Sequence, residues 1–455
     1  MNRKATITAA VSAALSSGAA FAAGPSITQI NGIPAANTIY ISGSSAIKAA
    51  LSNSIINGFC GGAGNTTVIT TAGTGSQDKN WLAFACTPVA GQATNGGLYL
   101  VDYRFEGGSV AGYLPIVNSK TVNQIDGPTL SSAAMVVTGT TEANGQTDTF
   151  TATGGTLTKH AVDLAIGDVE PKAITGNNYP KDYCTAVWGP QNQNGMFNQA
   201  ATGLIVDEVY ALFVNETGGN FTENPLNLTQ QTVANILAGN ITDWNAVTDV
   251  AGNTVVSAST AITVVNREYG SGSRTATDIL MVGDTCATNG VPETLIKQAA
   301  QFRYFSTGDV LTAAGSVAGA ITYASIDNNP ATNLTMVTLN GVVPSNLNAA
   351  LGTYPFWVEA AYINNSATTG ADSKAINNII AGLQNQATTA ALADINAIPN
   401  VAAANGGNFN TTVHLNPTSS GIVPSGGGTA TVYINPWSRG GTTCHNPVDD
   451  ATVVP

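Results

Sequence analysis

The sequence has few charges, few histidines and no long apolar run outside its N-terminal stretch. Only 9% of its 455 residues are Asp, Glu, Lys or Arg, and three are His. A transmembrane helix needs about 20 consecutive apolar residues, so we do not expect the body of the chain to cross a membrane. None of the five cysteines forms a Cys-x-x-Cys pair, and with so few histidines this disfavours a zinc site.

Signatures of several enzyme classes are also missing. The stretch 107–112, GGSVAG, does not match the Gly-x-Ser-x-Gly elbow, and GSGSR at 270–274 is neither a phosphate loop nor a dinucleotide fingerprint. A phosphatase needs a metal cluster or an activated nucleophile, and neither can be placed. His160, His414 and His445 have no partners at catalytic or metal-binding spacing and are expected to be structural. We therefore expect no catalytic residues, no cofactor and no metal.

The net charge of −12 argues against nucleic acid and anionic membranes as partners, because both attract basic proteins. It does not exclude a small anion as a ligand. A site built from backbone amides, hydroxyls and a single arginine binds an anion without a positive protein surface.

The N-terminus has the features of a secretory signal in their usual order. Arg3 and Lys4 form a positive start, an alanine-rich apolar stretch follows, and Ala-Phe-Ala at 20–22 is a small-x-small cleavage site. An ordinary N-terminal helix is the alternative. We expect residues 1–22 to be removed, and we expect no lipid anchor because no cysteine follows the cleavage site.

An exported protein folds in an oxidising compartment, where cysteines pair. Five cysteines allow one or two disulfides with one residue left over. We choose Cys60 and Cys86 as a local bridge, although spacing alone does not fix the pairing. The pairing of the others stays open: Cys184, Cys286 and Cys444.

Apolar strand-like runs alternate with helix-like stretches along most of the chain. Three units, at 37–51, 98–114 and 261–281, each show a strand, a Gly/Ser turn and a helix start. The run 204–216 is typical of a long strand, and 228–244 is typical of a helix. This alternation predicts an α/β fold with mixed sheets, helices on both faces and turns at the carboxyl ends of strands.

Two segments differ from this pattern, at 117–160 and 400–435. They are rich in Thr, Gly and Asn, and we expect them to be β-rich insertions or surface hairpins.

The length of 455 residues exceeds what one ordinary core holds, so two lobes are expected.

The stretch 266–280, NREYGSGSRTATDIL, concentrates charge in a chain that has little. The first amides of a helix lack internal acceptors and carry partial positive charge. Glycine lets the backbone approach a ligand, serine adds a donor, and Arg267 adds a full charge. The alternative is a simple Gly-Ser cap, with Arg267 in an ion pair with Glu268 or Asp278.

The same stretch resembles the Arg-x-x-Gly-Ser-Gly-Thr/Ser segment of the periplasmic phosphate-binding proteins that serve phosphate ABC transporters. Other pieces resemble segments of that family in the order it requires, over about 37–365. In chain order they are ISGSSAIKAAL, YRFEGGSVAG, VDLAIGDVEP, ILAGNITDWNAV, GSVAGAITYAS, LNGVVPS and TYPFWVEAAYI. Each piece alone is a weak signal, and their order carries the resemblance.

The resemblance implies a two-lobed fold of the type II periplasmic binding-protein class. After a signal peptide at 1–22, the first lobe would comprise 23–206 with 356–455, including a β-rich insertion at about 117–160. The second lobe would comprise 207–355. An anion would lie in the cleft between the two lobes.

The resemblance also implies a set of phosphate-binding residues. They are Ser44, Ser45, Ala46, Ser109 and Asp168 in the first lobe, and Arg267, Ser271, Gly272 and Ser273 in the second. Asp168 would accept the proton that phosphate carries near neutral pH and that sulfate lacks. The pattern departs from the family at Ala46, where an aromatic residue is usual, at Tyr269, where an acidic residue is usual, and at the additional cation Arg274.

The expected function is extracytoplasmic binding of inorganic phosphate for uptake by an ABC transporter, with the protein soluble in the periplasm or secreted. Arsenate or another oxyanion stays open as the ligand. One alternative is a secreted or surface-associated protein that reuses the fold, as the low charge and the Thr/Asn/Gly-rich insertions suggest. Another is an exported phosphatase, because such a cleft would also hold phosphate esters.

Overall fold

The computed structural model describes most of the chain in several ranges. These are 24–72, 81–140, 149–174, 199–283, 302–304, 306–329, 331–384, 421–424, 431–434, 437–438, 443 and 447–449. The predicted signal peptide lies outside them, as do Cys184, Cys286, Cys444, His414 and His445. No helix in these ranges is long and apolar enough to cross a membrane.

A 13-stranded mixed sheet runs through the molecule, as the predicted α/β class requires. Its strand order is β13 (Phe302–Tyr304), β12 (Thr263–Arg267), β14 (Ala320–Ser325), β10 (Gly203–Val214), β17 (Trp357–Asn364), β9 (Leu164–Gly167), β1 (Thr38–Gly43), β4 (Tyr99–Arg104), β3 (Trp81–Cys86), β2 (Thr67–Ala72), β6 (Ala134–Thr140) and β7 (Thr149–Thr153), with β15 (Thr335–Met336) on β10. Strands β1, β4 and β9 are parallel, as are β12, β13 and β14.

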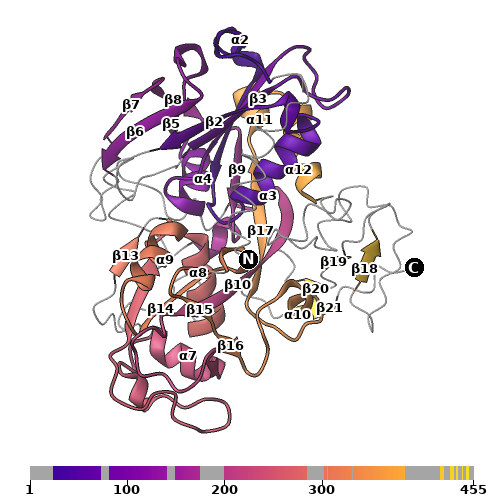
Figure 1. Ribbon diagram of the computed structural model, residues 1–455. Coiled ribbons are helices and arrows are strands. Elements are labelled where there is room, and N and C mark those ends of the chain that lie inside the picture. The colour runs from indigo at the N-terminus through magenta and orange to yellow at the C-terminus, as the bar shows by residue number, and fades with distance from the viewer. Residues whose placement is uncertain are drawn as a thin grey trace.

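Two halves lie on either side of the antiparallel pair β10 and β17 (Figure 1). The first half contains β9, β1, β4, β3, β2, β6 and β7, and the second contains β12, β13 and β14. The start of β10 pairs with β17, as in Val209↔Trp357, and its end pairs with β14, as in Tyr210↔Ser325. This 12-residue strand is apolar on both faces because it is buried on both; Asp207 and Glu208 are exceptions.

Helices cover the sheet in both halves. Their bounds are α2 (Ile27–Asn31), α3 (Lys48–Asn53), α4 (Gly108–Val117), α7 (Gln230–Leu237), α8 (Gly272–Thr277), α9 (Thr307–Gly315), α10 (Asn346–Ala350), α11 (Ser366–Thr369) and α12 (Ser373–Gln384). On α12, Ile376, Ile379 and Leu383 form a buried stripe against the first half, and each contributes about 1.5–3 kcal/mol to folding.

Helix α7 shows how local signals set the ends of an element. Thr229 caps its start, since the Thr232 amide donates to the Thr229 hydroxyl at 3.0 Å. Just past its end, Gly239 has φ +73°, a conformation that glycine adopts without strain. Val233 and Ile236 are buried, which confirms the helix predicted for this part of the chain.

The Thr/Gly/Asn-rich segment 117–160 is β-structured, but only part of it stands apart from the main sheet. Strands β5 (Thr121–Ile125) and β8 (Leu157–Ala161) form a separate antiparallel pair. Strand β6 instead pairs with β2 of the main sheet in parallel, and β7 pairs with β6 in the antiparallel direction. Met135 and Val137 of β6 are buried with Ile69 in one core cluster, so this strand belongs to the body of the first half.

The remaining described strands form short pairs. They are β11 (Asn227–Leu228) with β16 (Thr338–Leu339), β18 (Gly421–Pro424) with β19 (Thr431–Ile434), and β20 (Trp437–Ser438) with β21 (Val448–Asp449). Of the 400–435 segment, only β18 and β19 are described, and they form an antiparallel hairpin as the predicted β character requires.

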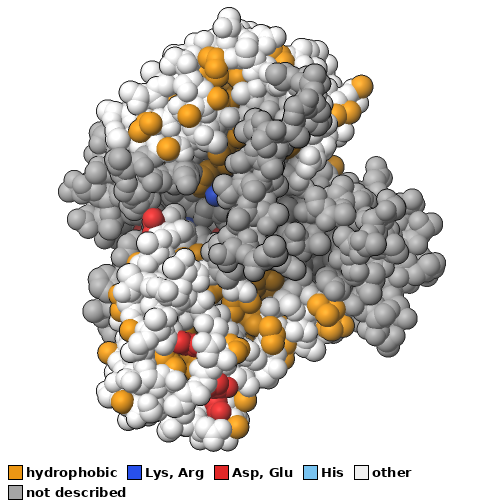
Figure 2. All heavy atoms as spheres, viewed as in Figure 1, with side chains coloured by type: hydrophobic (Ala, Val, Ile, Leu, Met, Phe, Trp, Pro, Cys, Tyr) orange, Lys and Arg blue, Asp and Glu red, His pale blue; other side chains and the backbone are white. Residues whose placement is uncertain are grey.

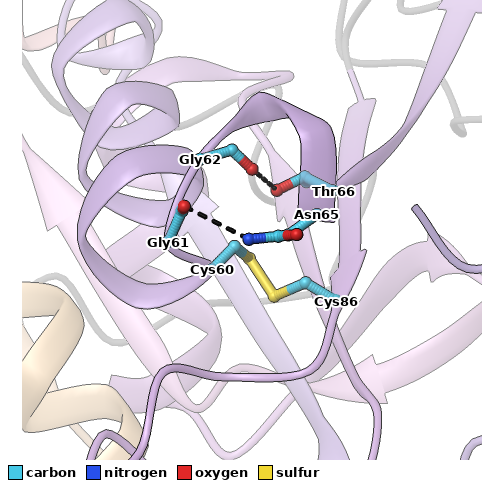
Figure 3. The surroundings of a disulfide bond; sticks show 6 residues. All are labelled: Cys60, Gly61, Gly62, Asn65, Thr66 and Cys86. Atoms are coloured by element: carbon cyan, nitrogen blue, oxygen red, sulfur yellow. Dashed lines mark hydrogen bonds between the residues drawn. A yellow bond between two sulfur atoms is a disulfide. The ribbon is translucent and has the colours of Figure 1, made fainter. Parts of the chain in front are cut away.

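The predicted Cys60–Cys86 disulfide is present, with the two Cα atoms 5.6 Å apart (Figure 3). It joins the end of the π-helical turn Ser54–Phe59 to the last residue of β3. Next to it, the Asn65 side-chain amide donates to the Gly61 carbonyl at 3.2 Å. Closing a loop of 26 residues contributes about 3–4 kcal/mol of stability by restricting the unfolded chain.

Candidate ligand-binding site

The predicted site residues come from strand ends that the topology brings together. Because β1, β4 and β9 are parallel, the turns after them lie at one edge of the first half. The turns after β12 and β13 share an edge of the second half in the same way. The two edges touch where the Val110 amide of α4 donates to the Gly270 carbonyl at 3.0 Å. The Ser/Gly turns of both halves therefore meet.

Asp168, directly after β9, lies at the centre of this junction and is 2% exposed. Its Oδ2 accepts a hydrogen bond from the Ser273 hydroxyl at 3.1 Å, and its backbone amide donates to the Ser109 hydroxyl at 3.1 Å. Its other carboxyl oxygen, Oδ1, is buried and has no hydrogen-bond partner among the described residues. A buried acceptor of this kind costs stability unless a ligand or water satisfies it.

Burial raises the pKa of Asp168 to about 6, against the opposing effects of Arg267, Ser273 and Tyr210. Desolvation penalises the carboxylate, whereas a nearby cation and hydrogen-bond donors favour it. The group is therefore ionised at neutral pH and takes up a proton in mildly acidic solution.

Arg267, the last residue of β12, is buried in the same junction. Its Nη1 donates to the Thr307 hydroxyl at 2.8 Å. Burial lowers the pKa of Arg267, and Asp168 opposes that shift. Thr307 Oγ1 also lies 3.5 Å from the Ser45 hydroxyl of the first half, so a chain of contacts links Arg267 to Ser45.

Thr307 belongs to this candidate site, and the sequence analysis missed it. It is the first residue of α9, which Ser306 caps by accepting from the Asp309 amide at 3.2 Å. The sequence YFSTGDVL has the same strand, Ser/Gly turn and helix order as the three recognised units. That order was the available signal, and the short strand β13 made it weak.

Three residues at the start of α8 have different roles in the junction between the two halves. The Ser271 hydroxyl caps the helix by accepting from the Arg274 amide at 3.4 Å. A Cβ on Gly272 would lie 2.4 Å from the Ser109 hydroxyl oxygen and 2.8 Å from Asp168 Oδ2, so glycine permits this close approach. Ser273 donates to Asp168, as described above, which places its hydroxyl inside the junction.

The turn after β1 is held by its own hydrogen bonds. The Ala46 amide donates to the Ser44 hydroxyl at 3.0 Å, and the Ser44 amide donates to the Ile166 carbonyl at 2.9 Å. The Tyr103 hydroxyl donates to the Ser44 carbonyl. Ser44 is thus fully buried and turned inward, whereas Ser45 is half-buried and faces Thr307.

Tyr269 and Arg274, the two departures within the arginine motif, contact each other. The Arg274 guanidinium lies 3.8 Å from the Tyr269 ring centroid, a cation–π arrangement. Arg274 also pairs with Asp278 at 3.4 Å and donates to the Arg267 carbonyl at 3.0 Å. Arg274 therefore stabilises the backbone at Arg267 through a hydrogen bond and forms an ion pair with Asp278.

Other polar groups have structural contacts. His160 stacks on Tyr40 with ring centroids 4.1 Å apart, and burial lowers its pKa. Within the described ranges no three His, Cys, Asp or Glu side chains are grouped so as to hold a metal ion. Charged side chains are sparse on the face shown in Figure 2, in line with the low charge content of the chain.

Part of the chain matches a known protein superfamily. Residues 187–389 match the model of the PBP superfamily domain. No curated protein matches the chain. Among solved structures, the chain is similar to a Clostridium perfringens protein described as a phosphate ABC transporter substrate-binding protein with bound phosphate. The identity is 14% and the TM-score is 0.45, with 80% of this chain and 99% of that chain covered.

The chain is also similar to two further solved structures. An ABC-type phosphate transport receptor from Vibrio cholerae is 15% identical with a TM-score of 0.37, covering 80% of this chain and 99% of its own. PstS from Borrelia burgdorferi is 12% identical with a TM-score of 0.37, covering 80% and 98%.

Residues 187–389 thus match the PBP superfamily domain, and they lie within a chain of mixed α/β fold. The match over residues 187–389 agrees with the predicted resemblance at the level of the PBP superfamily. At these identities the ligand has to be argued from the site itself.

Proposed function

We propose that the protein is an extracytoplasmic solute-binding protein that binds inorganic phosphate between its two halves. The observation that carries the proposal is Asp168 Oδ1, a buried acceptor without a partner beside the buried cation Arg267. This pair combines a charge that attracts an anion with an acceptor that requires the anion to carry a proton.

The chemistry of the two groups selects phosphate. The Arg267 guanidinium is a planar donor fork suited to an oxyanion. Phosphate still carries a proton near neutral pH and can donate it to the Asp168 carboxylate. Sulfate has no such proton, so its oxygen and Asp168 Oδ1 would be two acceptors in contact.

The ligand contacts follow from where each hydroxyl lies. We assign direct contacts to Ser45, Asp168 and Arg267, and we add Thr307 because it lies between Arg267 and Ser45. The remaining predicted residues shape the site: Ser44, Ala46, Ser109, Ser271, Gly272 and Ser273, whose hydroxyl donates to Asp168.

The proposed lobes are 23–206 with 356–455, and 207–355. Strands β10 and β17 are the connection about which they would close. The closed form would then be recognised by an ABC transporter permease outside the cytoplasm. The predicted signal sequence and the Cys60–Cys86 disulfide support this location.

Calorimetric titration of the protein, stripped of any ligand by unfolding and refolding, tests the proposal. We expect phosphate to bind with a Kd between about 1 µM and 1 mM and sulfate to bind much more weakly. Arg267→Met should abolish phosphate binding, whereas Lys120→Met, which removes an exposed positive charge elsewhere in the first half, serves as the control. Absence of phosphate binding over that range in the wild-type protein would contradict the proposal.

A further inference from the structure

Behind the proposed site, a second buried carboxyl is joined to Asp168 by hydroxyl groups. Glu208 of β10 is 1% exposed, and its Oε2 lies 3.0 Å from the Tyr210 hydroxyl. The Tyr210 hydroxyl lies 3.4 Å from the Ser273 hydroxyl, which in turn lies 3.1 Å from Asp168 Oδ2. Three oxygen–oxygen contacts therefore connect Glu208 to Asp168.

The number of protons in this chain decides whether its contacts are hydrogen bonds. Tyr210 and Ser273 have one hydroxyl proton each, and an ionised carboxylate has none. If both carboxyls were ionised, two protons would serve three contacts, and one pair of buried oxygens would face each other without a proton. One additional proton on either carboxyl completes all three hydrogen bonds in a single direction.

The surroundings place that proton on Glu208. Arg267 stabilises the ionised form of Asp168. Burial raises the pKa of Glu208 well above its ordinary value, and the charges of Asp168, Asp327 and Asp207 raise it further against the hydrogen bond from Tyr210.

The titratable groups that interact with this pair in the described part of the chain are consistent with a single proton at Glu208. These groups are Arg267 of β12, Asp207 and Tyr210 of β10, Asp327 of the turn Ile326–Asn328, Tyr103 of β4 and Tyr113 of α4. The three tyrosines are buried with raised pKa values and remain neutral hydroxyls.

We propose that Glu208 is a protonated carboxylic acid that keeps Asp168 ionised, and thereby ready to accept a proton-bearing ligand oxygen, through Tyr210 and Ser273. This inference rests on the proposed phosphate site and makes Glu208 a positioning residue that does not touch the ligand. The direction of the chain is then Glu208 to Tyr210 to Ser273 to Asp168. If the proton moved to Asp168 Oδ2, that carboxyl would be neutral, and its Oδ1 would be a weaker acceptor for the proton of the ligand.

Infrared spectroscopy of the ligand-free protein tests the proton directly. At about pH 8, well above the ordinary pKa of glutamic acid, the wild-type protein should show the C=O band of a protonated carboxyl. Glu208→Gln should remove part of that intensity, and the remainder is expected from other buried carboxyls with raised pKa values, such as Asp102. Glu216→Gln is the control, because Glu216 follows the same strand and accepts from the Leu226 amide, apart from the contacts that join Glu208 to Asp168. Burial raises the pKa of Glu216 to about 7, so at pH 8 Glu216 is mostly ionised and its replacement should leave most of the band in place. Equal bands in the wild-type protein and Glu208→Gln would overturn the inference.

Tyr210→Phe provides a second test, which also serves if Glu208→Gln fails to fold. Removing the Tyr210 hydroxyl should shift the carboxyl band, because Glu208 loses its hydrogen-bond partner. It should also weaken phosphate binding roughly fivefold with a smaller effect on sulfate. An unshifted band would overturn the inference.

The two proposals fail separately. If Glu208 is protonated but the protein does not bind phosphate, the hydrogen bonds from Glu208 to Asp168 are supported and the proposed function is contradicted. Phosphate binding by a protein in which Glu208 is ionised would support the proposed function and contradict the inference about Glu208. Glu208→Gln, whose amide donates to Tyr210 as the acid does, should keep the wild-type preference for phosphate over sulfate, and loss of that preference would also overturn the inference.

Discussion

At the scale of single residues, Asp168 is a buried carboxyl group whose ionised form is stabilised by several neighbours. Its hydrogen bond from Ser273 and the nearby Arg267 favour the carboxylate, and its burial opposes it. A group balanced in this way titrates within the pH range where phosphate itself changes charge. Its role should therefore be visible in both affinity and selectivity.

Asp168→Asn should narrow the preference for phosphate over sulfate. The amide keeps the shape but exchanges an acceptor for a donor at one of its two positions. We expect phosphate affinity to fall about tenfold to hundredfold, as for a lost hydrogen bond to a charged group, and sulfate affinity to stay equal or rise. Titrations with both anions measure the ratio, and an unchanged ratio would argue against proton recognition by Asp168.

Glu170 gives a prediction about stability. Its carboxylate accepts from the Thr443 amide at 3.0 Å and from the Thr443 hydroxyl at 2.7 Å. Burial raises its pKa from 4.5 to about 7, against these hydrogen bonds. Because the folded-state pKa is the higher one, the free energy of unfolding is greatest below pH 4.5 and falls as pH rises through about 7.

Glu170→Gln should remove this part of the pH dependence, because the amide does not ionise. The component amounts to about 3 kcal/mol between the two ends of the range. Urea unfolding of both proteins at a series of pH values measures it. Parallel stability curves for the two proteins would contradict the assignment.

The residues found from sequence and those missed differ in how far their partners lie along the chain. Asp168 and Arg267 end apolar strands, so their position at a strand edge follows from local pattern. Glu208 and Tyr210 lie within an apolar run, which predicts a strand but no partner. Their link to Ser273 depends on the contact between the Ser273 and Tyr210 hydroxyls, which joins α8 to β10 and for which the sequence contains no local signal.

At the scale of elements, the strand–turn–helix units were predictable because their signals are local. Apolar runs, Ser caps and Gly turns fixed β1, β4, β12 and the helices that follow. The partner of β6 was not predictable, since its parallel pairing with β2 joins residues about sixty positions apart, as in Thr70↔Ala134. Thr/Gly-rich composition suggested a surface hairpin, yet Met135 and Val137 pack into the core.

Gly272→Ala should keep the two halves from closing fully. The added Cβ would meet Ser109 and Asp168 of the opposite half within 3 Å. We expect phosphate affinity to fall about fivefold to hundredfold, the effect of a 1–3 kcal/mol steric penalty, while thermal stability changes little. Calorimetry measures the affinity, and small-angle scattering measures the compaction on adding phosphate.

Gly96→Ala is the matched control for this substitution. No atom lies within 4 Å of a Cβ at Gly96, so binding and compaction should remain as in the wild-type protein. Normal closure of Gly272→Ala would show that the approach of α8 to Asp168 is not required for binding.

At the scale of the whole molecule, β10 and β17 carry the sheet from one half to the other. The α/β class was predictable from the alternation of apolar strands and helices, and length alone suggested two lobes. That one sheet continues through both halves was not predictable, because it follows from the pairing of β10 with both β17 and β14. This continuity places the two sets of strand-end turns opposite each other.

The most direct test of this account is a crystal structure of the protein grown with phosphate. We predict a tetrahedral anion at the junction of the two halves, within about 3 Å of the Arg267 guanidinium and of Asp168 Oδ1, with Ser45 or Thr307 as a further contact. An anion bound elsewhere, or a junction without one in a protein that binds phosphate in solution, would contradict the account.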